Sequence, residues 1–260
     1  MIEFARSMWM PQAASTHAGQ VDGLIGWVHL LMLVLFVGWG IFFFFILVRF
    51  RKRRNPKANY EGTHSHLSRW VEGAVAVIEI ALLFGLSVPV WARVVANPTP
   101  AEEAMTIRVV GQQFAWNIHY PGADGVFGAT SVDLVDAEAN PVGVDRDDVM
   151  AKDDIVTVNQ LHIPVDTPIR IELSSFDVVH SFFLPEMRVK QDAIPGMTIP
   201  LSFTATATGE WEIACAQLCG LGHYRMRGFF TVHDQAGFNA WMAERVAEVE
   251  AASQPKGFFD

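Results

Sequence analysis

The two cysteines of the chain lie four residues apart, in the stretch "ACAQLCGLGHYRMRG" that runs from residue 214 to 228. A histidine follows the second cysteine after four residues, and a methionine follows the histidine after three. Two thiolates, an imidazole and a thioether are soft ligands that prefer copper or zinc. Structural zinc is usually held by cysteine and histidine alone, so the methionine favours copper. The candidate ligands are Cys215, Cys219, His223 and Met226.

Two other interpretations of this stretch are weaker. The spacing would also align the four side chains on one face of an α-helix, but Gly220 and Gly222 interrupt it and strand-like runs flank it. A disulfide between Cys215 and Cys219 would suit an exported domain. It would close only a short loop, gain little chain entropy and leave the histidine and methionine without a role. We therefore expect a metal-binding loop between two strands.

A second histidine is needed to complete such a site. A mononuclear blue-copper site uses one cysteine, two histidines and a weak axial methionine, so this stretch has one cysteine too many. Two thiolates can instead bridge two coppers, and each copper then needs its own terminal nitrogen. His180 is favoured because it follows a strand-like run in "SSFDVVHSFFLPEMRVKQDAIPG". The full set of candidates is His119, His162, His180 and His233.

Two apolar stretches near the N-terminus are long enough to span a membrane. Residues 24–48 contain no formally charged side chain, and their helix of about 37 Å would cross a hydrocarbon core of about 30 Å. A second stretch covers about residues 71–95 and includes Glu72 and Glu79. The loop between them is strongly basic, so the positive-inside rule places it in the cytoplasm. Because it adjoins a membrane span, we do not expect it to bind nucleic acid. Its basic residues are Arg49, Arg51, Lys52, Arg53, Arg54, Lys57 and Arg69.

These patterns divide the chain into four parts. We expect an external N-terminal tail (1–23), a transmembrane helical hairpin (24–96) with a basic cytoplasmic loop (49–70), a β-rich domain (97–233) and a C-terminal helix and tail (234–260). Both termini and the β-rich domain then lie outside a bacterial-type inner membrane. No cleavable signal peptide is expected, because "MIEFARSMWMPQAAS" lacks an apolar core of useful length.

The β-rich domain is expected to be a sandwich or barrel, because short strand-like runs alternate with Gly and Pro. Nine acids between residues 124 and 154 indicate an exposed acidic insertion, either a solvated loop or a docking surface. Asp234 can N-cap a C-terminal helix that has one apolar face. That face consists of Phe238, Trp241, Met242, Val246 and Val249.

Three motifs together resemble subunit II of haem-copper cytochrome c oxidases, the subunit that carries the dinuclear copper A centre. "DVVHSFFLPEMRVKQDAIPG" is similar to the first-histidine motif of that family, "CAQLCGLGHYRM" to its cysteine loop and "GQQFAWNIHYPG" to its aromatic stretch. The resemblance covers roughly residues 20–245. It implies a two-helix transmembrane hairpin, an all-β cupredoxin-like barrel and a C-terminal helix.

The resemblance also implies a ligand set for two copper ions. Both thiolates bridge the coppers, each copper has one terminal imidazole, and a thioether and a backbone carbonyl are weak ligands. The implied function is electron entry from a cytochrome c-type donor, with onward transfer to haem in subunit I, where oxygen is reduced to water with proton translocation. No catalytic residue is expected in this chain. The matching ligands are His180, Cys215, Gln217, Cys219, His223 and Met226.

The sequence departs from the family pattern at three positions. The family usually has Glu where this chain has Gln217, so the carboxylate that helps bind magnesium against subunit I is missing. A magnesium link through this residue is therefore not expected. The first tryptophan of the aromatic stretch, the proposed electron entry point, is replaced by Phe114. Phe114 and Trp116 are thus the electron-entry candidates, and Trp116 also fits a core position. Glu79 replaces a proline of the second span.

The two acids of the second span suggest contacts with other subunits, because an acid inside a span costs about 2.5–3.5 kcal/mol. Glu72 resembles the family glutamate at the mouth of the K proton pathway into subunit I, or it is an interfacial acid near Arg69. Glu79 lies seven residues further on, on nearly the same face, and is expected to face subunit I or another subunit.

Three other functions were compared with electron entry. The complete ligand set argues against a quinol-oxidase subunit II, which lacks copper. The two spans argue against a nitrous-oxide-reductase-like copper domain, and the polar Glu79 argues against a copper chaperone or carrier that acts alone. The expected partners are subunits I and III, membrane lipid and a separate cytochrome c-type donor, because the chain has no Cys-X-X-Cys-His motif for a haem of its own.

Overall fold

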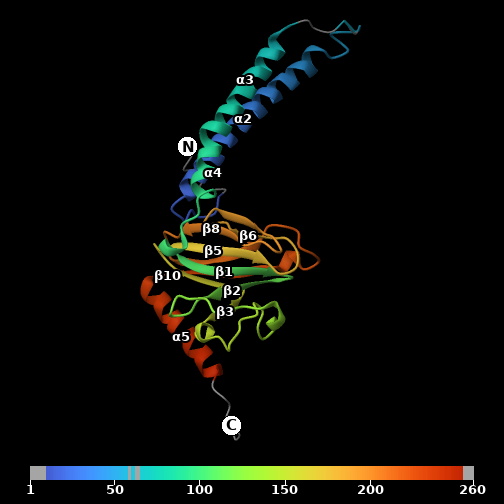
Figure 1. Cartoon of the computed structure of the whole chain (residues 1–260). Coiled ribbons are helices and arrows are strands. Elements are labelled where there is room, and N and C mark those ends of the chain that lie inside the picture. Colours follow the sequence, from blue (N-terminus) through green and yellow to red (C-terminus); the bar gives the residue numbers. More distant parts are fainter. Residues whose placement is uncertain (1–9, 58–59, 62–64, 254–260) are drawn as a thin grey trace. The chain divides into compact units, whose positions relative to one another are not determined.

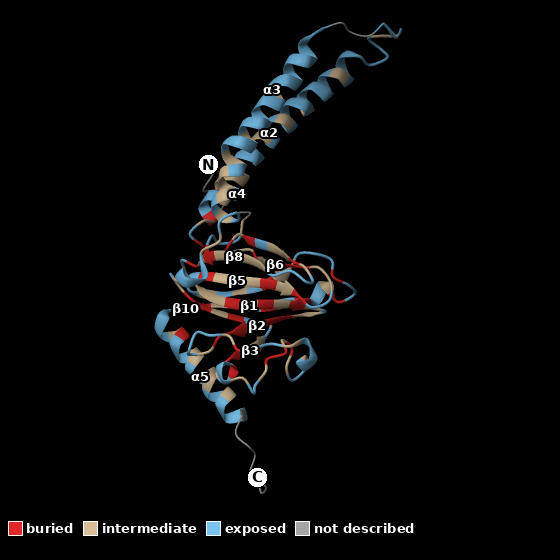
Figure 2. Ribbon diagram, in the orientation of Figure 1, coloured by how far each residue is buried: buried red, intermediate tan, exposed pale blue. Residues whose placement is uncertain are grey.

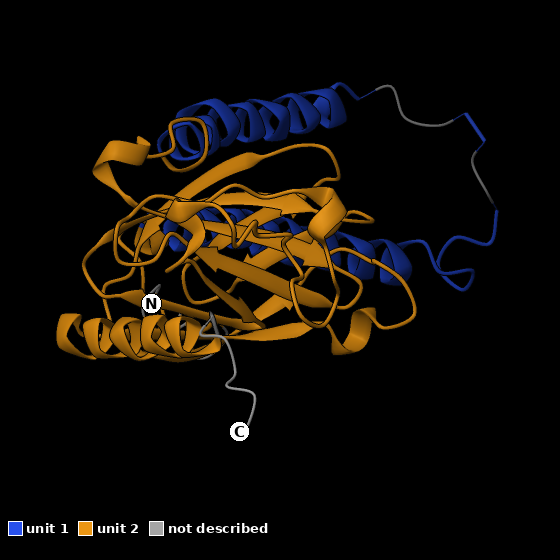
Figure 3. Cartoon of the chain, turned by 60° about the horizontal axis from the view of Figure 1, so that its bottom comes forward, with its two compact units in different colours: residues 1–6, 20–93 blue, residues 7–19, 94–260 orange. Residues whose placement is uncertain are grey.

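The computed structural model describes residues 10–57, 60–61 and 65–253 (Figure 1). The first part of the predicted N-terminal tail, two short pieces of the basic loop and the end of the C-terminal tail lie outside the described residues. Figure 3 colours the chain by two compact units. One contains residues 20–93, and the other contains residues 94–253 together with the segment 10–19.

The first unit contains two helical stretches long and apolar enough to cross a membrane. Helix α2 (Ala18–Arg49) begins earlier than the apolar run, inside the tail expected over residues 1–23. The second stretch comprises α3 (Leu67–Leu82), a π-helical turn (Leu83–Ser87) and α4 (Val88–Val94). The π-turn lies just before Pro89, which has no N–H to continue the helical ladder. Most side chains of both stretches are exposed within the chain (Figure 2), as lipid-facing surfaces require.

The second unit contains two five-stranded sheets, ordered β3-β2-β1-β5-β8 and β4-β10-β9-β6-β7. The first sheet consists of β1 (Met105–Gln112), β2 (Ala115–Tyr120), β3 (Ile155–Val158), β5 (Pro168–Ser175) and β8 (Ile199–Thr204). The second consists of β4 (Gln160–Pro164), β6 (His180–Leu184), β7 (Val189–Ala193), β9 (Gly209–Cys215) and β10 (Arg227–His233). Neighbouring strands are antiparallel except for the parallel pairs β1–β5 and β4–β10.

The core lies between the two sheets, and the alternation of the sequence determines which residues enter it. In β1 and β5 every second residue is buried, because successive side chains of a strand point to opposite faces. Both sheets contribute large aromatic side chains to this core. The largest buried ones include Trp116 and Tyr120 from the first sheet and Phe182 and Phe230 from the second.

Strand β2 is buried on both faces, because the acidic segment 124–154 covers its outer face. His119, on that outer face, contacts the ring of Phe127 and hydrogen-bonds Asp154. The carboxylates of Asp136 and Asp148 accept backbone N–H groups within the segment, which lowers the pKa of both. The expected exposed insertion is thus only partly exposed, since several of its acids hold its own turns together.

Both flanking segments of the β-rich unit pack on it. Near the N-terminus, Ala14 is fully buried, and its N–H and C=O groups bond Glu186 and Thr206. This segment therefore adds a short β-bridge beside the end of β8, which the sequence did not indicate. At the other end, the carboxylate of Asp234 accepts the N–H of Gly237 and caps α5 (Gln235–Ser253), as expected.

Candidate metal centre

Strands β9 and β10 are antiparallel neighbours, and they fix both ends of the cysteine loop (residues 215–226). Cys215 is the last residue of β9, and Met226 immediately precedes β10. His223 lies between them in a short 3-10 turn. The loop therefore joins two strands, as the glycines and the flanking runs predicted, and it is not an α-helix.

Strand β6 brings the fifth side chain to the loop from a distant part of the sequence. His180 is the first residue of β6, and β6 pairs with β9 through Phe182 and Cys215. Gly111 of β1 leaves the space that the His180 ring occupies, because a Cβ at that position would lie 2.9 Å from the imidazole. His180, Cys215 and Cys219 form a cluster whose ligand atoms all lie within 4.8 Å of one another.

The donor atoms cluster around the two sulfurs. The Sγ atoms of Cys215 and Cys219 are 3.8 Å apart, which excludes the bond of about 2.05 Å that a disulfide requires. His180 Nδ1 lies 4.0 Å from the first sulfur, and His223 Nδ1 lies 3.6 Å from the second. Met226 Sδ is 3.7 Å from Cys219 Sγ. An imidazole nitrogen thus lies within 4.0 Å of each sulfur.

Three of these four separations fit donors that share a metal ion, and the fourth, from His180 Nδ1 to Cys215 Sγ, is slightly longer at 4.0 Å. Two donors bound to one ion at about 2.0–2.3 Å with a tetrahedral angle are about 3.3–3.8 Å apart. Hydrogen bonds between nitrogen and oxygen are shorter, at about 2.7–3.2 Å. The carbonyl oxygen of Gln217 lies 3.2 Å from Cys215 Sγ, so it too is close to the cluster of donors. Its side chain is exposed.

The two thiols differ in pKa because they lie in different surroundings. Burial raises the pKa of Cys215, but hydrogen bonds with His180 and with the backbone outweigh this effect and lower it to about 6. Burial and the negative charge of Cys215 raise the pKa of Cys219 to about 11. A cation between the sulfurs would relieve the repulsion that opposes the second thiolate, because metal binding replaces protons.

Asp177, which the sequence reasoning did not single out, orients His180. Its Oδ1 accepts a hydrogen bond from His180 Nε2 at 2.9 Å, on the opposite side of the ring from the sulfurs. Although burial of the His180 ring opposes its charged form, hydrogen bonds with Cys215 and Asp177 raise its pKa overall. Carboxylates commonly fix metal-binding imidazoles in this way. The available sequence signal was an acid three residues before the histidine, inside the motif already identified.

The two electron-entry candidates lie at different depths. Phe114 is half-buried, and its ring lies so close to Gly222 that a Cβ there would meet it at 2.3 Å. The guanidinium of Arg225 lies 5.9 Å from the centre of the same ring. Trp116 is fully buried, and its ring meets that of His180 edge to face at 5.9 Å. Trp116 is therefore a core residue that also contacts a candidate ligand.

The remaining histidine candidates have partners of their own. His119 Nε2 lies 2.7 Å from a carboxylate oxygen of Asp154, and both side chains are buried. His162 Nδ1 lies 2.8 Å from His233 Nε2, and the His162 ring stacks on Trp241 of α5 at 4.4 Å. Burial, His233 and Arg245 lower the pKa of His162 to about 4.

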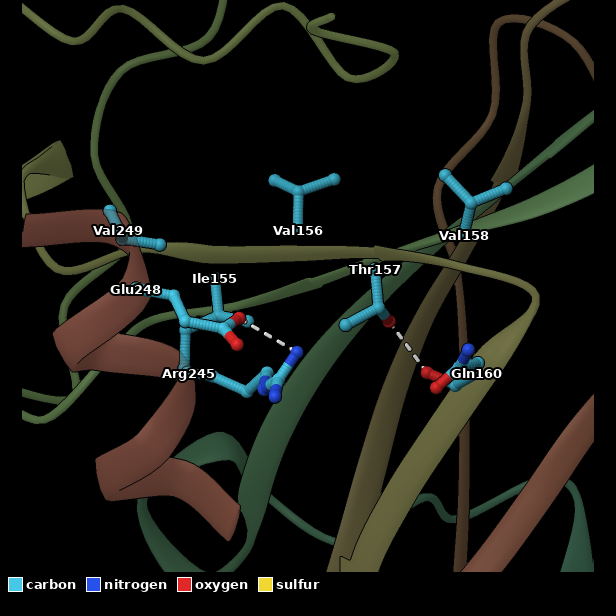
Figure 4. Close-up of a pocket in the computed structure, with 8 residues that line it drawn as sticks. All are labelled: Ile155, Val156, Thr157, Val158, Gln160, Arg245, Glu248 and Val249. Carbon is cyan, nitrogen blue, oxygen red and sulfur yellow. Dashed lines mark hydrogen bonds and ion pairs between the residues drawn. The ribbon is translucent and has the colours of Figure 1, made fainter. Parts of the chain in front are cut away.

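Two further features lie outside the cysteine loop. Glu72 and Glu79, both on α3, are exposed within this chain, as they would be if other subunits covered them. A cavity of about 220 Å³ lies between β3 and α5 (Figure 4). Arg245 and Glu248 form an ion pair at its edge. Its lining contains neither cysteine nor histidine, so it does not compete with the loop as a metal site.

Comparison with known proteins identifies the family. A family model described as the periplasmic domain of cytochrome c oxidase subunit II matches residues 105–230. The chain is 32% identical over 243 residues to the alternative cytochrome c oxidase subunit 2 of Bradyrhizobium diazoefficiens, covering 93% of this chain and 85% of that protein. The chain belongs to the cytochrome c oxidase subunit II family. It is also 27% identical over 251 residues to cytochrome c oxidase subunit 2 of Synechocystis sp., covering 90% of this chain and 75% of that one.

Among solved structures, the chain is similar to the periplasmic domain of subunit II of cytochrome oxidase from Bradyrhizobium japonicum. The alignment has 30% sequence identity and a TM-score of 0.41, and it covers 56% of this chain and 95% of that one. As a subunit II, the chain is part of a haem-copper terminal oxidase and is a membrane protein with a periplasmic domain. The predicted fold is confirmed: two long apolar helices, a two-sheet cupredoxin-like domain and a C-terminal helix.

Proposed function

We propose that this chain is the electron-entry subunit of its oxidase and holds a dinuclear copper A centre. Single electrons enter from a cytochrome c-type donor and leave for haem in subunit I, where oxygen is reduced to water with proton translocation. The observation that supports this most directly is the cluster of donors: two thiols 3.8 Å apart, with an imidazole nitrogen within 4.0 Å of each sulfur. Two cysteines and two histidines could also hold one zinc ion, but the thioether of Met226 beside Cys219 favours copper.

Each donor has a distinct proposed role. The two thiolates and the two imidazoles would hold the copper ions, and the thioether and the backbone carbonyl would be weaker ligands. Bound copper supplies a one-electron couple, and the chain holds the ligands so rigidly that little moves when the electron arrives. Strands β6, β9 and β10 provide that rigidity, because they fix the positions of the ligands or of their immediate neighbours. The proposed ligands are His180, Cys215, Gln217, Cys219, His223 and Met226.

Phe114 is the proposed entry point for the electron. Its half-buried ring lies against Gly222, which directly precedes the ligand His223. A docked donor can therefore approach the ligand through this ring. Trp116 is fully buried, so a donor cannot contact it directly. Its proposed role is limited to the path of the electron inside the domain, beside His180.

The cysteine loop also has features of a subunit contact. Leu218, Leu221 and Tyr224 are 77%, 97% and 87% exposed, although large apolar side chains of a loop are usually covered in an assembled complex. Subunits I and III, lipid and the donor are the proposed partners. No magnesium link through Gln217 is proposed, because an amide lacks the carboxylate charge that this hard cation prefers.

The topology proposal places both termini and the copper domain outside a bacterial-type inner membrane. The hydrogen bonds between the segment around Ala14 and the β-rich unit support a position of both on the same side of the membrane. Two membrane-length helices separate them in sequence. An even number of crossings and the basic loop between them agree with this arrangement.

Glu72 and Glu79 are proposed to face neighbouring subunits from α3. Glu72 is the candidate for the proton path into subunit I, and Glu79 is the candidate for a proton-path or interface contact. Replacement of Glu79 by Gln keeps the size and removes the ionisable group. A Glu79→Gln oxidase with normal turnover, pumping and assembly would remove the functional role proposed for this residue.

An electron paramagnetic resonance spectrum of the purified chain, loaded with copper in detergent, tests the main proposal. One unpaired electron shared equally by two copper nuclei gives a seven-line hyperfine pattern. An electron on one copper gives four lines. The seven-line pattern is expected, and a four-line spectrum from fully loaded protein would contradict the dinuclear centre.

A further inference from the structure

Gln113 contacts both halves of the candidate metal centre, although it is not one of the proposed ligands. It lies in the turn between β1 and β2. Its side-chain Nε2 donates to the carbonyl oxygen of Cys219 at 2.6 Å. Its backbone N–H donates to Asp177 Oδ2 at 2.8 Å, and the other oxygen of Asp177 holds His180. One residue thus connects the cysteine loop to the histidine that β6 supplies.

The cysteine loop is shaped to receive this amide. Gly220 has a φ of +133°, and a Cβ at this position would lie 2.7 Å from Gln113 Nε2. Glycine is therefore required both by the backbone conformation and by the close approach of the side chain. The neighbouring Phe114 fills the equivalent space beside Gly222. Both glycines of the loop thus lie against the Gln113–Phe114 turn.

This contact matters because the carbonyl of Cys219 belongs to the peptide that enters Gly220. Fixing this peptide fixes the backbone from which the Cys219 side chain extends. The position of its sulfur relative to Cys215 and His223 then depends on the Gln113 amide. Partners that do not bind metal directly but orient its ligands typically change metal affinity by about 10–100-fold.

We infer that Gln113 is a positioning residue of the metal centre, which sets the separation of the two sulfurs through the Cys219 carbonyl and links this to the orientation of His180. This inference rests on the proposed function and names a residue outside the proposed ligand set. The same contact holds the turn that carries Phe114, the proposed electron-entry residue, against the cysteine loop.

The test replaces Gln113 by Met, which has a similar length but no N–H donor. The backbone N–H to Asp177 is unchanged. Gln112→Met is the matched control, because the neighbouring Gln112 side chain accepts a hydrogen bond from Asn117. Full-length chains are loaded with copper in detergent and titrated with a copper chelator, and their paramagnetic resonance spectra are compared.

Gln113→Met is expected to lose copper about 10–100-fold more readily than the control and to show an altered hyperfine splitting. Equal retention and an identical spectrum in the two variants would overturn the inference. Circular dichroism of the copper-free chains shows whether each variant is folded. If Gln113→Met is unfolded, Gln113→Glu, which keeps the shape but not the donor, replaces it under the same criteria.

The outcome for the wild-type chain separates this inference from the proposed function. A four-line wild-type spectrum would contradict the dinuclear centre, whatever Gln113 does. A seven-line wild-type spectrum together with unchanged Gln113 variants would contradict only the positioning role.

Discussion

The β-rich domain contains two histidine pairs with opposite surroundings. In the ligand pair, the proposed ligands His180 and His223, both imidazoles lie beside the two sulfurs. In the packed pair, His162 and His233, the imidazoles hydrogen-bond each other. The comparison shows that two neighbouring histidines can have very different surroundings. Thiolates on one side of the ring and, for His180, a carboxylate on the other distinguish the ligand pair.

The pKa values of the two pairs are shifted in opposite directions. Hydrogen bonds with Cys215 and Asp177 overcome burial and raise the pKa of His180. Burial and the nearby His233 and Arg245 lower the pKa of His162. Negative partners attract a cation to the first pair, whereas the second pair is arranged to remain neutral.

Copper content should show the largest difference between the pairs. His223→Asn removes one terminal nitrogen, so copper should fall from two ions per chain to one or none, and the mixed-valence spectrum should disappear. His233→Asn, the matched change in the packed pair, should keep both. Metal analysis and paramagnetic resonance of the purified variants measure this. Loss of copper from His233→Asn alone would reverse the assignment.

A smaller difference is expected for the acids beside the two pairs. Asp177→Asn weakens the partner that orients His180, so copper affinity should fall by about 10–100-fold in a chelator titration. Asp234→Asn changes the acid next to His233 and should leave copper affinity unchanged. Equal affinities in the two variants would mean that the Asp177 contact has no influence on the ligand.

The packed pair should make folding stability depend on pH. Burial lowers the pKa of His162 from its ordinary value of 6.5 to about 4 in the folded chain, so the unfolded chain takes up the proton first as pH falls. The stabilisation is complete above about pH 6.5 and is lost towards pH 4, by about 1–2 kcal/mol after allowance for partial exposure. Urea unfolding of copper-free protein at several pH values measures it.

His162→Gln is the variant that isolates this effect. Other groups also titrate in this range, so the difference between the wild-type chain and the variant is the relevant quantity. The variant should lose less stability between pH 6.5 and 4 than the wild type. Parallel stability curves would show that His162 does not carry the pH dependence.

The smallest expected effect concerns the residue that holds the packed pair in place. The Tyr120 hydroxyl accepts the N–H of His162 at 2.7 Å and donates to its C=O at 3.1 Å. Tyr120→Phe should cost about 1 kcal/mol of unfolding free energy, because these buried backbone groups lose their partner. Copper content and spectrum should not change. A change in either would show that the two pairs are coupled.

The sequence indicates much of the fold because its signals there are local. The charge-free run of residues 24–48 predicts α2, and the alternation in "TPIRIELSSF" predicts β5. The cysteine loop is predictable because its glycines exclude a helix. The segment around Ala14 was not predictable, because its short run has no strand pattern and its partners lie far along the chain.

The candidate site was predictable to the extent that a motif marks its residues. His180 could be separated from the other histidines only by the residues around it, since His162 and His233 also come together in space. Asp177 and Gln113 were missed, because their roles depend on hydrogen bonds made across the fold to His180 and Cys219. A single Gln or Asp in a sequence does not reveal such contacts.

The N-terminal segment imposes an order on biogenesis. Ser15 bridges to Ala205, about 190 residues later in the chain. At synthesis rates of about 5–20 residues per second, roughly 10–40 seconds pass between the production of the two partners. The first transmembrane helix is therefore made well before the segment that precedes it can dock. Formation of this bridge is a late step, which requires most of the second half of the chain.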